Sequence, residues 1–403
     1  MPQISSCPNC LQESVETFYT VDPVPVHSVM LVPTREEALH FPAGKIALGL
    51  CNTCGFITNT SFDESKMSYS PKCEETQGFS PTFQSFHHGL AEDLIERYGL
   101  RNKSVLEIGC GKGEFISMLC AMGGNYGIGF DPAFVPQRRP EQGGDAVEFI
   151  QDFYSEKYTH IKADFIACKM TLEHIPDTHH FVSTVRRAIG ESFDSTVFFQ
   201  VPDMSRVLKD VAFWDIYHEH CSYFTAGALQ NLFVMAGFDV VDVWTNYDGQ
   251  YLMITARPAR QPLHHARIPV PSTGAEVRAI QSFAIEAERR IRFWQQTVDR
   301  LKSEGQRLVI WGSGSKGVAF LSALRAHVND GRIEYAVDIN PFRKGYFMPG
   351  TGQEIVEPAF LSAYQPDVVI AMNSIYTTEI ESDLKGCGVN AVVLPIEAVE
   401  AAV

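Results

Sequence analysis

Short apolar runs alternate with segments of helical periodicity through the middle of the chain. Between about residues 78 and 260 the apolar runs have the length of buried strands; they read "SVLEIGC", "NYGIGFD", "ADFIACKM" and "STVFFQVP". This alternation predicts a doubly wound α/β sheet with right-handed crossovers. A later run near residue 255, "YLMITARP", predicts one more strand.

The pattern changes on both sides of this region. Residues 259–274 read as a linker, followed by a long helical pattern and a second strand-turn-helix, "RLVIWGSGSKGVAFLSAL". The first 75 residues are rich in Pro, Thr and Cys, with short extended runs. We therefore expect three domains, at residues 1–75, 76–262 and 263–403.

Composition narrows the class of protein. The 403 residues are 45% hydrophobic and 20% charged, as in ordinary globular proteins, and carry a net charge of −15. So acidic a chain argues against broad binding to nucleic acid or anionic membranes. No signal-peptide pattern and no apolar run of membrane-spanning length occurs, so we expect a cytoplasmic protein.

Four cysteines form two C-x-x-C pairs, Cys7 with Cys10 and Cys51 with Cys54. The two-residue spacer lets both sulfurs of a pair face one ion, and four thiolates favour a structural zinc. The alternatives are two unrelated pairs or redox-active cysteines. The pattern predicts a ribbon-like zinc site with a long inserted loop.

A glycine-rich turn, "VLEIGCGKGEF", follows the first strand of the central region. Gly109, Gly111 and Gly113 would let the backbone approach a ligand at a helix N-terminus. Glu107 precedes the turn, and Asp131 ends the next strand, where a carboxylate can bind ribose hydroxyls. A dinucleotide site is one alternative. The pattern resembles motif I of the class I S-adenosylmethionine-dependent methyltransferases.

Further residues are candidates for contact with this cofactor. Asp152 could accept a hydrogen bond from an adenine amine with Phe153 stacked nearby, although a solvated helix start explains them equally well. Pro132 follows Asp131, and Met170 follows a strand at the edge where ligands bind.

The stretch "DIYHEHCSYF", residues 215–224, concentrates polar side chains. His218 and His220 could bind a metal, but no third ligand is evident from the spacing, and the H-E-x-x-H motif is absent. His220 could instead act as a general base, oriented by Glu219, with Tyr217 donating to a developing oxyanion. A buried polar turn without catalytic function is the third interpretation.

These motifs together resemble the deoxysugar 3-C-methyltransferases, which act on nucleotide-linked 4-keto-deoxyhexoses. The resemblance implies a class I methyltransferase core between a zinc-binding domain and a second Rossmann-like α/β domain. It also implies that Tyr217, Glu219 and His220 carry the site, with His220 as the base. His174 and Tyr69 match further catalytic positions. The reaction implied is removal of a proton beside a ketone, followed by attack of the enolate carbon on the sulfonium methyl.

The turn "GSGSKG" in the last domain could bind a phosphate, with Lys316 beside it. Arg343 and Lys344 follow the next strand, and the resemblance implies that this domain holds the nucleotide-sugar substrate. A domain without a ligand and an incomplete NAD site are the alternatives.

For the whole chain, the alternatives are an O- or N-methyltransferase on another small precursor, a non-catalytic scaffold and a zinc-dependent nucleic-acid binder. A monomer or a homodimer is expected.

Overall fold

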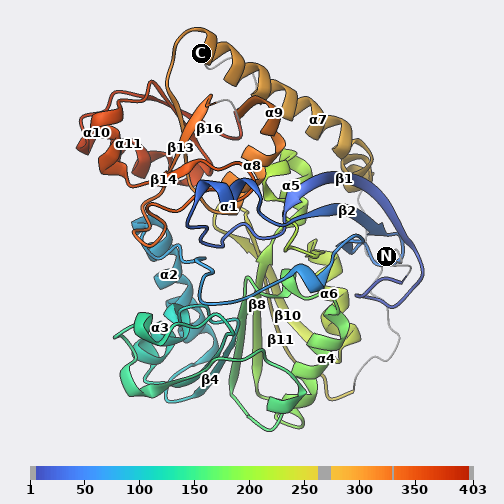
Figure 1. Cartoon of the computed structure of the whole chain (residues 1–403). Helices are drawn as coiled ribbons and strands as arrows, with labels where there is room; N and C mark the ends of the chain where they lie inside the picture. Colours follow the sequence, from blue (N-terminus) through green and yellow to red (C-terminus); the bar gives the residue numbers. More distant parts are fainter. Residues whose placement is uncertain (1–5, 262–273, 329–330, 399–403) are drawn as a thin grey trace.

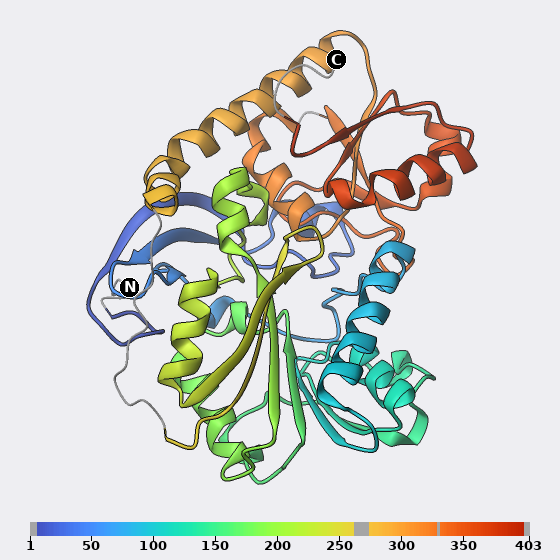
Figure 2. The ribbon, with the colours of Figure 1, turned by 180° about the vertical axis from the view of Figure 1, so that it is seen from behind.

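The computed structural model describes residues 6–261, 274–328 and 331–398, and these residues form three sheets (Figures 1 and 2). The central sheet has the strand order β10-β11-β8-β7-β4-β5-β6. Its strands are β4 (Ser104–Ile108), β5 (Tyr126–Phe130), β6 (Val147–Ile150), β7 (Phe165–Lys169), β8 (Thr196–Pro202), β10 (Phe238–Asn246) and β11 (Tyr251–Pro258). The strands from β6 to β8 are parallel, and β11 is antiparallel to both its neighbours, β8 and β10.

Helices cover both faces of this sheet, which explains why its inner strands are apolar along their whole length. They are α2 (Pro81–Tyr98), α3 (Glu114–Gly123), α4 (Thr178–Ile189) and α6 (Ala226–Met235). The short helix α5 (Met204–Asp210) follows β8 and packs instead against the long helix of residues 274–303. The expected strands are confirmed. Because the strand order reverses between β4 and β7, a crevice opens at their carboxyl ends.

The N-terminal sheet is antiparallel and has the order β1-β2-β3-β9. Three of its strands, β1 (Val15–Pro25), β2 (Ala43–Cys51) and β3 (Ile57–Asn59), precede the central domain, together with α1 (Arg35–Leu39). The fourth, β9 (Ser222–Tyr223), comes from within the central domain and pairs through Tyr223 with Ile57. The two expected domains are therefore joined through a shared sheet.

The C-terminal unit begins with the long helix α7 (Gly274–Ser303), which runs along the outside of the molecule in Figure 1. A parallel sheet follows in the order β14-β13-β12-β15-β16. Its elements are β12 (Leu308–Trp311), α8 (Ser315–Ala323), α9 (Arg325–Val328), β13 (Ile333–Val337), β14 (Glu354–Val356), α10 (Leu361–Tyr364), β15 (Val368–Ala371), α11 (Thr377–Gly386) and β16 (Val392–Pro395). The expected boundary at residues 262/263 lies outside the described residues.

One hydrophobic core connects all three parts. Phe283 and Trp294 on α7 are buried with Tyr19 of β1, Trp214 of the central domain and Phe320 of α8. The rings of Tyr19 and Phe283 meet edge to face at 5.0 Å. In the described part of the chain no helix combines the length and the apolarity needed to cross a membrane.

Candidate active site

A cavity of about 970 Å³ lies at the carboxyl ends of β4, β5 and β7. All three parts of the chain line it: His27 and Tyr69 from the N-terminal part, Gly111 and His220 from the centre, and Lys316 from the C-terminal unit. This is the crevice that the strand order places at the topological switch point.

The glycine turn forms one wall of the cavity. Gly109 and Gly113 have φ angles of 71° and 84°, which favour glycine. A Cβ atom would lie 1.9 Å from Oγ1 of Thr171 at the first position and 2.3 Å from the ring of Phe149 at the second. Other side chains are therefore sterically excluded, and helix α3 begins directly beside the cavity.

Asp131 and Pro132 line the cavity after β5. The two carboxylate oxygens of Asp131 accept hydrogen bonds from the backbone N–H groups of Gly111, at 2.9 Å, and Ala133, at 2.7 Å. Burial raises the pKa of Asp131. Each carboxylate oxygen can accept more than one hydrogen bond, so a diol remains a suitable ligand.

Glu107 is buried at the end of β4 and accepts a hydrogen bond from the N–H of Ile116 at 3.0 Å. Burial raises its pKa to about 7, against the opposing charge of Lys169. Burial lowers the pKa of Lys169 to about 8, and its Nζ lies 2.5 Å from Nε2 of His87. Sequence reasoning missed Lys169, although a cation within the apolar run "FIACKM" was a usable signal.

Three further cofactor candidates also line the cavity. Asp152 accepts hydrogen bonds from the hydroxyl of Tyr158 at 2.6 Å and the N–H of Phe153 at 2.9 Å. Phe153 is 56% exposed, which leaves its ring available for stacking. Met170 has a φ of 49°, and its N–H donates to the carbonyl of Gln200 at 2.8 Å.

The structure brings His174, His220, Tyr217 and Tyr69 together on the cavity wall. The rings of His174 and His220 meet edge to face at 4.8 Å, and those of Tyr217 and His220 at 4.7 Å. Nδ1 of His174 lies 3.1 Å from the hydroxyl of Tyr69. Burial, together with the charge on His174, lowers the pKa of His220 to about 3, so its imidazole is neutral at pH 7.

Glu219 does not orient His220 as expected. Residues 218–219 form a turn, and the carboxylate of Glu219 instead accepts hydrogen bonds from the N–H of Ser28 at 2.9 Å and from the Ser28 hydroxyl. Nδ1 of His27 lies 3.3 Å from the same carboxylate. Burial favours the neutral acid, but the contacts with His27, His174 and Ser28 outweigh it and lower the pKa of Glu219 to about 2. Glu219 thus connects the central domain to the N-terminal part.

Asp215 is a second carboxylate near His220 and contacts several polar side chains. It accepts a hydrogen bond from the Tyr217 hydroxyl at 2.9 Å and pairs with Arg206 at 3.0 Å and with Lys316. Burial opposes ionisation, but Lys316 and Arg206 hold the pKa of Asp215 below its ordinary value. Asp215 opens the polar stretch, yet nothing in its spacing distinguished it.

The two remaining basic candidates differ in position. Arg343 is buried at the cavity and donates to the carbonyls of Ser313, at 3.0 Å, and Glu74. Lys344 is exposed and pairs with Glu357 at 2.6 Å, and it is not among the residues that line the cavity. The structure therefore does not bring Lys344 to the site.

Two family models match the chain. Residues 83–243 match a methyltransferase domain, and residues 273–393 match a C-methyltransferase C-terminal domain. The chain is a methyltransferase. C-methyltransferase NovU of Streptomyces niveus is 28% identical over 305 residues, covering 72% of this chain and 71% of that protein. These matches support methyl transfer to carbon.

Other methyltransferases match a smaller part of the chain. The ubiquinone biosynthesis O-methyltransferase of Pseudomonas savastanoi is 32% identical over 113 residues, which is 26% of this chain and 48% of that protein. Among solved structures, the 1,6-didemethyltoxoflavin-N1-methyltransferase of Burkholderia thailandensis has a TM-score of 0.35 at 19% identity, covering 46% of this chain and 80% of that one.

The central sheet of this methyltransferase has the class I fold, for which S-adenosylmethionine is the supported cofactor. The polar and charged groups that line the cavity suit that molecule. Gly111 leaves backbone exposed at a helix start, Asp131 offers carboxylate oxygens to a diol, and the acidic Glu107 and Glu114 suit a cationic ligand.

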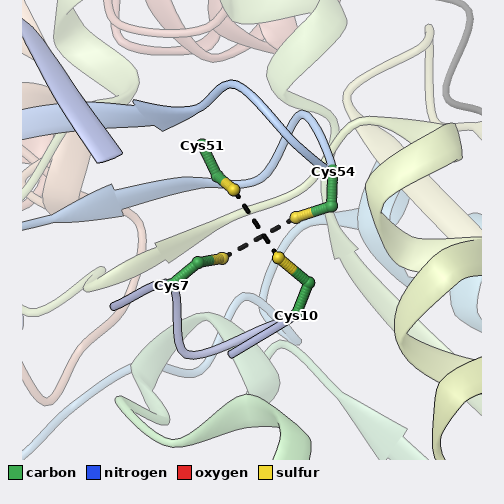
Figure 3. A group of neighbouring side chains, drawn as sticks. All are labelled: Cys7, Cys10, Cys51 and Cys54. Carbon is green, nitrogen blue, oxygen red and sulfur yellow. Dashed lines mark hydrogen bonds between the residues drawn. The ribbon is translucent and has the colours of Figure 1, made fainter. Parts of the chain in front are cut away.

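The four cysteines of the methyltransferase converge on one point (Figure 3). All are buried, and the sulfurs of Cys7 and Cys54 are 3.7 Å apart, those of Cys10 and Cys51 3.6 Å. Tetrahedral zinc with Zn–S bonds of about 2.3 Å places neighbouring sulfurs about 3.8 Å apart. None of these four cysteines is in a disulfide, so all four sulfurs are available as ligands, and their spacing suits a zinc ion.

Proposed function

We propose that this methyltransferase transfers a methyl group from S-adenosylmethionine to a carbon atom beside the ketone of a nucleotide-linked 4-keto-deoxysugar. The observation that carries the proposal is the buried, neutral imidazole of His220, which lines the same cavity as the glycine turn. Transfer of a methyl group to carbon requires a base, because a proton must leave the substrate carbon before that carbon can act as a nucleophile. Binding of the cofactor alone requires no such base.

The cofactor supplies a methyl group already activated by a positively charged sulfur. The residues of this chain that would hold it are the turn at Gly109–Gly113, with Asp131 at the ribose, Asp152 and Phe153 at the adenine, and Glu107 and Met170 nearer the methionine end. His220 takes the proton from the substrate carbon, and holding both reactants in one closed cavity supplies much of the acceleration.

The hydrogen bonds of His174 indicate which group receives the enolate oxygen. Nδ1 of His174 lies 3.0 Å from the backbone carbonyl of Glu219, and a carbonyl only accepts. Nδ1 therefore carries the proton, and the Tyr69 oxygen can only accept from it. The hydroxyl proton of Tyr69 is left free to donate into the cavity. Tyr69 is thus the favoured oxyanion donor, while Tyr217 donates to Asp215.

Lys316 and Arg206 favour a substrate with an anionic carrier group. Both line the cavity and share the carboxylate of Asp215, and Lys316 lies in the first turn of α8. Arg206 also pairs with Asp210 and Glu397. A phosphate at this helix start would be favoured by the exposed N–H groups and by both cations. Arg343 would act here by holding the turn at Ser313.

The experiment is to incubate the protein with methyl-¹³C S-adenosylmethionine and a panel of nucleoside-diphosphate 4-keto-deoxyhexoses, and to observe the product by NMR. A new methyl signal on carbon supports the proposal. A methyl signal on oxygen would replace it with alcohol methylation. Bound cofactor without transfer to any sugar would remove the deoxysugar substrate, while leaving the methyltransferase itself intact.

A further inference from the structure

Glu173 is a buried carboxyl group without a hydrogen-bond partner. It lies in the 3₁₀ helix η5 (Leu172–His174) after β7, is 1% exposed and lines the cavity. Within the part of the chain that the structure describes, neither of its carboxylate oxygens has a partner. A buried carboxyl group in this condition is strongly unfavourable, which indicates that it is held for a function.

A second unpartnered group lies on the neighbouring segment. Nδ1 of His220 has no hydrogen-bond partner among the described residues either. A carboxylate oxygen of Glu173 and ring nitrogens of His174 and His220 all lie within 4.8 Å of one another. The N–H of Cys221 donates to the carbonyl of Glu173 at 2.9 Å, which fixes the two segments side by side.

The other carboxylates near His220 are already engaged. Glu219 is held by Ser28 and His27, and Asp215 by Lys316 and Arg206. Among the described residues, the charged groups that act on His220 are His174, Glu219, Asp215 and Lys316, and Glu173, Tyr217 and Tyr223 lie close to it. Of the carboxylates among them, Glu173 has both oxygens unused.

We infer that Glu173 is the positioning residue of the base: it accepts a hydrogen bond from Nδ1–H of His220, directly or through one water, and leaves Nε2 unprotonated toward the substrate. The inference rests on the proposed function, in which His220 is the base. A small rotation of the side chains or a single bridging water can close the distance between the carboxylate of Glu173 and the ring of His220.

The proton balance explains why such a partner is needed. Nε2 of His220 takes the proton, the electron pair stays on the substrate as an enolate, and the new imidazolium is balanced by ionised Glu173. The enolate carbon then takes the methyl from sulfur, and His220 later returns its proton to water. Burial lowers the pKa of His220 to about 3, so an isolated His220 is a weak base, whereas an adjacent anion strengthens it.

Glu173 should therefore affect how kcat depends on pH. Burial raises its pKa to about 8, so the ionised form that assists His220 grows as pH rises through this value. We expect kcat to rise with pH through about 8 in the wild type. Glu173→Gln should lower kcat about 100-fold, remove this limb and leave cofactor affinity unchanged, because general-base catalysis contributes about that much. Glu173→Asp should recover part of the activity.

Two measurements separate this inference from the proposed function. The first is the ¹H–¹⁵N spectrum of the imidazoles in protein without substrate, with His220 assigned by comparison with His220→Gln. Above pH 8, where Glu173 is ionised, we expect Nδ1 to be protonated in the wild type and the tautomer mixture to change in Glu173→Gln. An unchanged spectrum together with an unchanged pH profile would overturn the inference.

The second is deuterium exchange at the carbon beside the ketone of a nucleoside-diphosphate 4-keto-deoxyhexose, with S-adenosylhomocysteine bound. Exchange lost in His220→Ala and slowed in Glu173→Gln supports both ideas. Exchange retained in His220→Ala rejects the proposed base, whatever Glu173 does. Metal content should be equal in wild type and Glu173→Gln; loss of one ion per chain in the variant would assign the side chain to a metal and overturn the positioning role.

Discussion

Glu219 should stabilise the fold through its charge. Its carboxylate is buried and accepts hydrogen bonds from Ser28, with His27 at 3.3 Å. These contacts lower its pKa from 4.5 to about 2, which corresponds to about 3 kcal/mol of stability. Because the pKa is lowered on folding, this stability is fully present above pH 4.5 and is lost as pH falls toward 2. Glu219→Gln keeps the shape and removes the charge.

The assay is urea unfolding of wild type and Glu219→Gln at several pH values. We expect the variant to be less stable by about 3 kcal/mol at pH 7, with a difference that shrinks below pH 4.5. Glu141→Gln, at an exposed position, is the matched control and should change stability by less than about 0.5 kcal/mol. A difference that is small at pH 7, or that does not shrink in acid, would refute the role assigned to Glu219.

Three other outcomes are expected. Metal analysis should find about one zinc per chain, and Cys51→Ser should lose it and lower the melting temperature; a stable, metal-free wild type would exclude the zinc site. Asp131→Ala should weaken binding of S-adenosylmethionine at least about 10-fold by calorimetry, since it removes acceptors and frees the turn, and unchanged binding would place the ribose elsewhere. Lys316→Ala should raise KM for the nucleotide-linked substrate about 10-fold, whereas Lys344→Ala should not; equal effects would mean general electrostatics.

The local patterns predicted the fold well, because they depend on neighbours in sequence. The glycine positions 109 and 113, the acid at Asp131 and the strands of the central sheet all follow from backbone sterics and burial, which a short window of sequence reports. The two C-x-x-C pairs also predicted that four sulfurs meet at one point, because each two-residue spacer lets both sulfurs of a pair face the same side.

The missing parts of the site depend on contacts between distant segments. The partner of Glu219 is Ser28, separated by 191 positions, and that of Asp215 is Lys316, separated by 101. No local pattern indicates such pairs. The sequence does not distinguish Glu173, because a single acid beside His174 is typical of an ordinary helix until its burial is known.

The shared N-terminal sheet limits how this enzyme can be recombined. β9 pairs with β3 two residues after His220, and the residue before it, Glu219, is hydrogen-bonded to Ser28, so His220 lies between two attachments to the N-terminal part. A chimera that exchanges the first 75 residues for those of a relative would have to keep both attachments in register. The C-terminal unit, by contrast, reaches the cavity without supplying a strand to the N-terminal sheet, so exchange of its cavity-lining residues would leave both attachments beside His220 in place.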